Sequence, residues 1–261
     1  MSETRKTALV TGASAGLGKE LASLFAKYGH DLVLVARSET KLRTLAGDLA
    51  RAHGITAHVV PADLADGGAP AQIFERTQQL GVAVDVLVNN AGFGTNGAFL
   101  DLDLAREKEM IAVNCTALLE LTHRFVHPMR ARGQGRVLNI ASTAGFQPGP
   151  FMATYYATKA FVISFSEALA FELQGTGVTV TCHCPGATAT EFAATAGNDK
   201  SKLFQRSGVA EAKEVALHAY RSLMKGEVLS VHGALNKIGV QGLRVSPRSL
   251  IRSIAAGLNR P

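Results

Sequence analysis

The sequence has no tryptophan, only three cysteines in 261 residues, and no apolar run as long as the roughly 18 residues that a membrane-spanning helix needs. An odd, small number of cysteines argues against a disulfide framework and favours a reducing compartment. The first residues lack the apolar stretch of a secretion signal, so we expect a cytoplasmic protein. Neither fixed-period repeats nor low-complexity tracts occur, which excludes solenoids and propellers.

Signatures of metal and nucleic-acid binding are also missing. Cys182 and Cys184 flank His183 within an apolar strand pattern, and no second ligand pair stands at zinc spacing, so we expect no metal. The net charge is +6, but the basic residues form no nucleic-acid-binding motif. The excess charge could instead attract an anionic cofactor.

What the chain does have is a regular alternation of strand-like and helix-like segments. Helical patterns cover 17–28, 39–52, 69–79, 104–130, 154–173 and 211–224. Between them lie β-branched, apolar runs at 7–10, 31–36, 57–61, 84–88, 135–140, 178–182 and 228–231. Strands that are apolar on both faces are typical of sheets covered on two sides. The alternation predicts one α/β domain over residues 1–261, a Rossmann-type, doubly wound parallel sheet of about seven strands with helices on both faces.

A glycine-rich turn follows the first strand. In the segment Thr11–Gly18, Gly12 permits a tight turn, Gly16 lets backbone approach a ligand, and Gly18 allows close packing of helix on strand. The helix that begins there would offer free N–H groups and its positive dipole end to a pyrophosphate. No Gly-Lys-Ser/Thr follows, which argues against a P-loop.

The end of the second strand predicts which dinucleotide binds. An acidic residue there would hold the ribose 2′-hydroxyl of NAD, whereas this chain has Ala36 followed by Arg37. A guanidinium suits a 2′-phosphate, so we predict NADP(H) in preference to NAD(H).

Tyr155 and Lys159 stand four residues apart in a helical pattern, and Ser142 follows the fifth strand. Positions i and i+4 share a helix face, so the ammonium can lie beside the phenol. A nearby cation favours phenolate, so we expect the pKa of Tyr155 to lie below its ordinary value of about 10. Taken alone, such a pair is usually one buried ring and one solvated charge. The neighbouring Tyr156 is out of register with Lys159, and we expect it only to pack.

In combination, these segments resemble the short-chain dehydrogenase/reductase family, in particular its bacterial NADP-preferring branch. The resemblance covers Thr7 to about Thr190. It rests on T-G-x-x-x-G-x-G at the first turn, Ala62-Asp63-Leu64, Asn89-Asn90-Ala91-Gly92, Asn114, Ser142, the Y-x-x-x-K of Tyr155 and Lys159, and Pro185-Gly186 with Thr190.

The resemblance implies an NADP(H)-dependent oxidoreductase that transfers hydride between nicotinamide and a carbonyl or secondary alcohol. It implies proton transfer by Tyr155, assistance from Lys159, polarisation by Ser142 and a water chain anchored by Asn114. The residues implied to bind the cofactor are Gly12, Ser14, Gly16, Leu17, Gly18, Arg37, Asp63, Leu64, Asn90, Ala91, Gly92, Tyr155, Lys159, Pro185, Gly186, Thr188 and Thr190. It also implies a homodimer or homotetramer through the helices at 104–130 and 154–173. Two alternatives stay open, a non-catalytic NADP-binding sensor or scaffold and an epimerase or dehydratase.

Apolar side chains gather in the segments that should frame the substrate, namely Phe93, Phe146, Phe151, Met152, Phe192, Leu203 and Phe204. We therefore expect an uncharged or largely apolar substrate, although the same aromatics could pack a lid or a subunit interface. A mobile lid is expected over about 187–210. The basic, amphipathic segment 236–261 is expected to pack on the domain or on a partner subunit rather than on a membrane.

Overall fold

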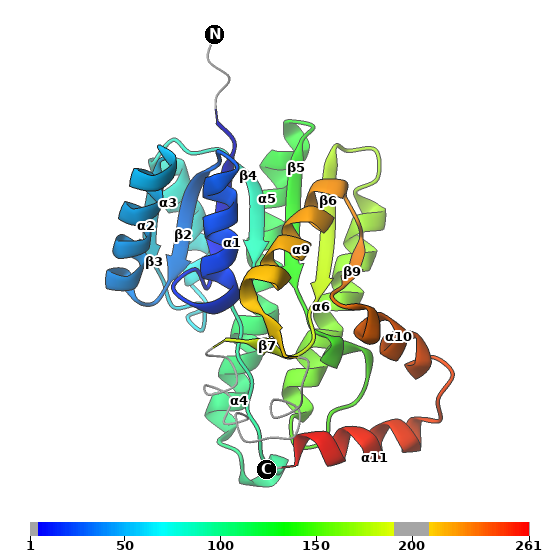
Figure 1. Ribbon diagram of the computed structural model, residues 1–261. Helices are drawn as coiled ribbons and strands as arrows, with labels where there is room; N and C mark the ends of the chain where they lie inside the picture. Colours follow the sequence, from blue (N-terminus) through cyan, green and yellow to red (C-terminus); the bar gives the residue numbers. More distant parts are fainter. Residues whose placement is uncertain (1–4, 191–208, 261) are drawn as a thin grey trace.

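The computed structural model describes residues 5–190 and 209–260. Its main sheet has seven strands in the order β3-β2-β1-β4-β5-β6-β9 (Figure 1). Every neighbouring pair is parallel. The strands are β1 (Thr7–Thr11), β2 (Asp31–Ala36), β3 (Ala57–Pro61), β4 (Val84–Asn89), β5 (Gly135–Ile140), β6 (Val178–Cys184) and β9 (Leu229–Val231). The order reverses beside β1, which confirms the predicted doubly wound, Rossmann-type sheet.

Helices cover both faces of this sheet, as the apolar strands require (Figure 1). One face packs against α1 (Gly16–Lys27), α2 (Glu39–His53) and α9 (Ala212–Lys225). The other packs against α3 (Ala69–Gln79), α5 (Leu118–Ala131) and α6 (Ala153–Glu172). Successive residues of a strand point to opposite faces, so Leu9 belongs to one core while Ala8 and Val10 belong to the other.

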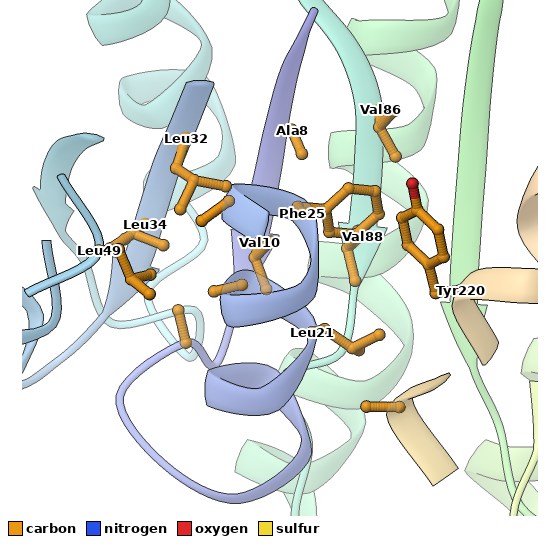
Figure 2. Packing of buried hydrophobic residues seen from close by; sticks show 14 of the residues in the cluster. Ala8, Val10, Leu21, Phe25, Leu32, Leu34, Leu49, Val86, Val88 and Tyr220 are labelled. Carbon is orange, nitrogen blue, oxygen red and sulfur yellow. The ribbon is translucent and has the colours of Figure 1, made fainter. Parts of the chain in front are cut away.

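Figure 2 shows the core beneath α1, where Phe25 lies beside Val10, Val88 and Tyr220. The rings of Phe25 and Tyr220 meet edge to face with their centroids 5.2 Å apart. Burying one large apolar side chain stabilises a fold by about 1.5–3 kcal/mol. This core fixes α1 against β1, and thus fixes the turn between them at one end of the sheet.

The long helix expected over 104–130 is interrupted in the structure. Helix α4 (Leu104–Ile111) and α5 are joined by a π-helical turn, Ala112–Ala117. A π turn inserts one extra residue into the helical ladder and often marks a functional site. Asn114 is buried within it. The hydrophobic pattern could not reveal this turn because the helix continues in the same direction on both sides.

The carboxyl ends of the strands carry the remaining elements (Figure 1). A two-residue pair joins β7 (Thr188–Ala189) to β8 (Ala210–Glu211). Most of the lid expected at 187–210, with Phe192, Leu203 and Phe204, lies outside the described residues. The segment expected to be amphipathic forms two helices, α10 (Ala234–Leu243) and α11 (Arg248–Asn259). Among the described residues, no helix combines the length and apolarity needed to cross a membrane.

Candidate active site

A cavity of about 550 Å³ opens at the carboxyl ends of β1, β2, β4, β5 and β6. It runs from the glycine turn after β1 to the end of α11. Of the residues predicted to be catalytic or to bind the cofactor, all line it except Gly18 and Asn114, which lie behind its wall. The lining residues that were predicted are Gly12, Ser14, Gly16, Leu17, Arg37, Asp63, Leu64, Asn90, Ala91, Gly92, Ser142, Tyr155, Lys159, Pro185, Gly186, Thr188 and Thr190.

The glycine turn leaves room for a ligand backbone. Gly12 and Gly16 have φ angles of +65° and +50°, a left-handed conformation that favours glycine. A Cβ on Gly18 would stand 2.2 Å from the carbonyl oxygen of Gly12, so only glycine lets α1 start this close to β1. Ala15, the N-cap residue of α1, makes no side-chain hydrogen bond to the first turn. The N–H groups of this turn therefore face the cavity as an anion site, which fits the pyrophosphate of a dinucleotide.

The glycine turn begins the cofactor half of the cavity. The other end of this half is lined by Ala36, Arg37, Ser38 and Lys41. The Ser38 hydroxyl caps α2 by accepting from the N–H of Lys41 at 3.4 Å. Two cations thus flank the point where an acidic residue would bind NAD. Lys41 was not predicted from the sequence, although its position in the first turn of the helix after Arg37 was a usable signal.

Thr11 ties the end of β4 to the end of β1. Its hydroxyl accepts from the N–H groups of Asn90 and Ala91 at 3.0 and 3.1 Å, and Asn90 Nδ2 donates to its carbonyl at 2.9 Å. Asn89, the first residue of the Asn89–Gly92 motif, has another role. Its buried amide donates to Thr122 and Asn139, both at 2.9 Å, and so braces β4 against α5 and β5 instead of lining the cavity.

Tyr155 and Lys159 lie on the buried face of α6, with 8% and 5% of their surfaces exposed. The ammonium Nζ donates to the carbonyl of Ile140 at 2.9 Å and lies 5.8 Å from the centroid of the Tyr155 ring. Gly145 permits this packing, since a Cβ there would meet the backbone of Lys159 at 2.7 Å.

The expected lowering of the Tyr155 pKa is wrong for this arrangement. Burial raises the pKa of the phenol above its ordinary value, and a hydrogen bond with Ser142 only partly opposes this. Burial also lowers the pKa of Lys159 to about 8. The i, i+4 spacing placed both groups on one face but did not reveal that the ammonium donates to a carbonyl of β5, nor that burial has the largest effect on the pKa of the phenol.

The Ser142 side chain bonds the backbone of two loops, its own loop after β5 and the loop after β6. Its hydroxyl accepts from the N–H of Ala144 at 3.1 Å and donates to the carbonyl of Pro185 at 3.4 Å. It therefore serves as a loop cap and as a polar group at the Tyr155 phenol together.

Asn114 has its side chain committed to neighbouring protein groups. Its oxygen accepts from the N–H of Phe93 at 3.1 Å, and its nitrogen donates to the carbonyl of Phe93 at 2.9 Å and to the Thr158 hydroxyl at 3.0 Å. The π turn thus joins the loop after β4 to α6, one residue before Lys159.

The other half of the cavity is lined partly by side chains that sequence reasoning did not place there. Phe93 and Met152 line it as expected, but Phe146 and Phe151 do not. The additional lining groups include Arg106, Glu109, Tyr156, Asn236 and Leu258. Arg106 lies 3.8 Å from the centre of the Phe93 ring and pairs with Glu109 at 2.6 Å, so its charge is already balanced.

The described residues contain no group of three or more His, Cys, Asp or Glu side chains arranged to hold a metal ion. Cys182 and Cys184 lie with their sulfurs 3.9 Å apart, both buried.

Comparison with known proteins agrees with this geometry. The family described as short chain dehydrogenase matches residues 6–201. The chain is 38% identical to the ketoacyl reductase HetN of Nostoc sp. over 70% of its own length and 63% of that protein's. A short-chain dehydrogenase from Sphingobium yanoikuyae, solved in complex with NADPH, is 34% identical, covers 92% of this chain and 93% of its own, and has a TM-score of 0.82. A 7beta-hydroxysteroid dehydrogenase structure is 28% identical, covers 96% of both chains, and has a TM-score of 0.87.

The chain belongs to the short-chain dehydrogenase family. It is an oxidoreductase that acts on CH–OH and C=O groups with a nicotinamide cofactor. The resemblance stated from the sequence motifs is thereby confirmed.

Proposed function

We propose that the protein is an NADPH-dependent reductase of largely apolar ketones or aldehydes, with Tyr155, Lys159, Ser142 and Asn114 as its working set. One observation carries this proposal. The buried phenol of Tyr155, the Ser142 hydroxyl and the Lys159 ammonium line the same cavity as the glycine turn of α1. A carbonyl between the first two groups would therefore lie within reach of a nicotinamide whose pyrophosphate rests on α1.

Arg37 and Lys41 support NADP(H) over NAD(H). Both line the cavity beside Ala36, where an acidic side chain would repel a 2′-phosphate. A guanidinium can bind a phosphate through two parallel hydrogen bonds, which adds geometric fit to charge.

The protein's part in the reduction is proton delivery and charge stabilisation. When bound, NADPH supplies the hydride. Tyr155 gives its phenolic proton to the substrate oxygen as that oxygen becomes an alkoxide, and its raised pKa keeps the proton in place until then. The Ser142 hydroxyl turns its hydrogen from the Pro185 carbonyl, 3.4 Å away, and donates it to the same oxygen. The Lys159 cation stabilises the phenolate that Tyr155 becomes.

In this proposal Asn114 is a positioning residue, which holds other groups of the site in place. Its amide already bonds Phe93 and Thr158, so it holds the cavity wall and α6 in register. We propose that Asn114 also anchors the water chain that returns a proton to Tyr155 through Lys159.

The substrate half favours an apolar molecule. Phe93, Met152 and Leu258 line it, and the charges of Arg106 and Glu109 neutralise each other. The names of the relatives point the same way, since they include a ketoacyl reductase and a hydroxysteroid dehydrogenase.

The decisive experiment is a screen of carbonyl compounds that follows the loss of NADPH absorbance, run with the wild type, Tyr155→Phe and Tyr156→Phe. We expect turnover of apolar ketones, with kcat lowered about 100- to 10,000-fold by Tyr155→Phe, because a positioned proton donor contributes that much. Tyr156→Phe should lower kcat far less. A preference for small charged sugars or acids would reject the substrate class. Full turnover by Tyr155→Phe would reject the assignment of the proton donor.

A further inference from the structure

Helix α11 is joined to the wall of the active site through one buried side chain, that of Asn259. This residue has none of its surface exposed although it is the last of a C-terminal helix. Its side-chain oxygen and nitrogen lie 3.2 and 3.1 Å from the hydroxyl of Tyr156, and the nitrogen also donates to the carbonyl of Pro150 at 3.2 Å. Its own carbonyl accepts from Asn96 Nδ2 at 2.8 Å.

These bonds reach three segments that are distant in the sequence and meet at the cavity. They are the loop after β4, the turn 149–152 before α6, and the first turn of α6 itself. Figure 1 shows α11 below the carboxyl ends of the strands. Leu258, the residue before Asn259, lines the cavity. The end of α11 is therefore part of the site wall.

The turn that Asn259 holds is strained. Phe151 has a φ of +66°, the only described residue other than glycine with a positive φ. A non-glycine residue adopts this conformation only where surrounding contacts offset its cost. Those contacts are the bond from Gly97 N–H to the Phe151 carbonyl at 2.9 Å and the bond from Asn259 to the preceding carbonyl. The next residue, Met152, lines the cavity.

Tyr156 transmits the same constraint toward the Tyr155 phenol. Its ring lies 6.1 Å from that of Tyr155 at 77°, and Gly149 of the turn packs so close to it that a Cβ there would stand 2.2 Å from the ring. Tyr156 was expected only to pack. Its buried hydroxyl instead depends on Asn259 for hydrogen bonds, and losing such a partner inside a protein is costly.

We propose that Asn259 is a positioning residue for the carbonyl substrate, which fixes Tyr156 and the Pro150–Met152 turn so that the substrate half of the cavity keeps its shape. The proposal rests on the proposed reductase function for its kinetic readout. It assigns to the C-terminal helix a role in substrate binding that is separate from cofactor binding, because none of the Asn259 bonds reaches a residue of the glycine turn.

The test compares Asn259→Leu, which keeps the size but loses the hydrogen bonds, with Ser253→Ala on the same helix. The Ser253 hydroxyl is exposed and bonds the carbonyl of Ser249 one turn earlier. We expect Asn259→Leu to raise the KM for the carbonyl about tenfold or more, because it leaves buried polar groups unpaired. The Kd for NADPH should stay within about twofold of the wild type. Ser253→Ala should change neither.

A double-mutant cycle combines Asn259→Leu with the conservative substitution Tyr156→Phe. Asn259→Leu should cost much less in a Tyr156→Phe background, because the hydroxyl that needs Asn259 is already gone. An unchanged carbonyl KM in folded Asn259→Leu would overturn the proposal. So would a matching rise in the NADPH Kd, since it would indicate general loosening of the fold.

Hydrogen exchange separates this proposal from the proposed function. In Asn259→Leu the Gly97 amide, which bonds Phe151, should exchange at least tenfold faster, whereas amides of β1 should not change. This result would support the positioning role even if no carbonyl in the screen were reduced. Unchanged exchange at Gly97 and at 149–152 would overturn it whatever the activity.

Discussion

The two halves of the cavity are built in different ways. The cofactor half is made mostly of turns that follow β1, β2, β3, β4 and β6, so most of its groups come from residues close to a strand end. The substrate half combines the loop after β4, the turn before α6 and the ends of α10 and α11. Its central bonds join residues 103, 109 and 163 positions apart. Changes in the first half should therefore affect any substrate, whereas changes in the second should affect some substrates and not others.

The largest effect is expected where the cofactor half has no room. Gly18→Ala would put a Cβ 2.2 Å from the Gly12 carbonyl oxygen and 2.5 Å from Asn90 Nδ2. The first is backbone of the turn, and the second is held by its hydrogen bond to the Thr11 carbonyl, so neither can easily move away. Overpacking of this kind costs about 1–3 kcal/mol or more, so we expect the NADPH Kd, measured by calorimetry, to rise about 100-fold.

Gly47→Ala is the matched control for that change. Gly47 lies in α2 with nothing within 4 Å of its Cβ position, so alanine should leave NADPH binding unchanged and stabilise the helix by up to about 1 kcal/mol. Equal NADPH affinity in the Gly18→Ala and Gly47→Ala proteins would contradict the claim that the lack of space at Gly18 determines cofactor binding.

The next largest effect should change the KM for NADPH and not the KM for NADH. Arg37→Ala should raise the KM for NADPH about 10- to 100-fold, because it removes a charge-assisted bond to phosphate, and should hardly change the KM for NADH. Arg43→Ala is the control, since Arg43 pairs with Glu39 on the exposed side of α2 and does not line the cavity. Equal losses with both cofactors would reject the NADP preference.

A third effect concerns the boundary between the halves, where Lys159 lies. Burial lowers its pKa to about 8 from the ordinary 10.5, so the cation that stabilises phenolate is lost as pH rises through 8. The pKa of Tyr155 is raised, so the proton donor stays loaded over this range. We expect kcat/KM for reduction to be level below pH 8 and to fall up to about tenfold per pH unit above it.

A loss of folding stability caused by the titration of Lys159 would not explain this fall in kcat/KM. Between pH 8 and 10.5 the unfolded chain binds more protons at Lys159 than the folded chain does, so this group makes stability rise with pH in that window. Lys159→Arg keeps its charge at every pH of the test, and whatever activity it retains should show no break near pH 8. A wild-type rate that climbs above pH 8 would contradict the role given to the ammonium.

The same division explains what could be predicted from the sequence. The parallel sheet and the cofactor half could be predicted from local sequence. A glycine turn after an apolar strand indicates a pyrophosphate site, and the residue after the next strand indicates which dinucleotide binds. Asn259 and Leu258 carried no such signal, since an asparagine near the end of a basic amphipathic helix has no local reason to be buried. Burial also reversed the predicted pKa shift of Tyr155, because desolvation depends on the whole fold.

The smallest effect is expected at the substrate end, and it should depend on the substrate. Leu258→Ala removes apolar surface from the cavity wall while leaving the Asn259 bonds in place. The KM for a bulky apolar ketone should rise about tenfold, since a pocket recognises each lost contact only weakly, and the KM for a small ketone should barely change. Ile254→Ala, on the same helix but 55% exposed, is the control and should change neither. If Leu258→Ala weakened both ketones and NADPH equally, the end of α11 would support the whole cavity, and the separation of the two halves would fail.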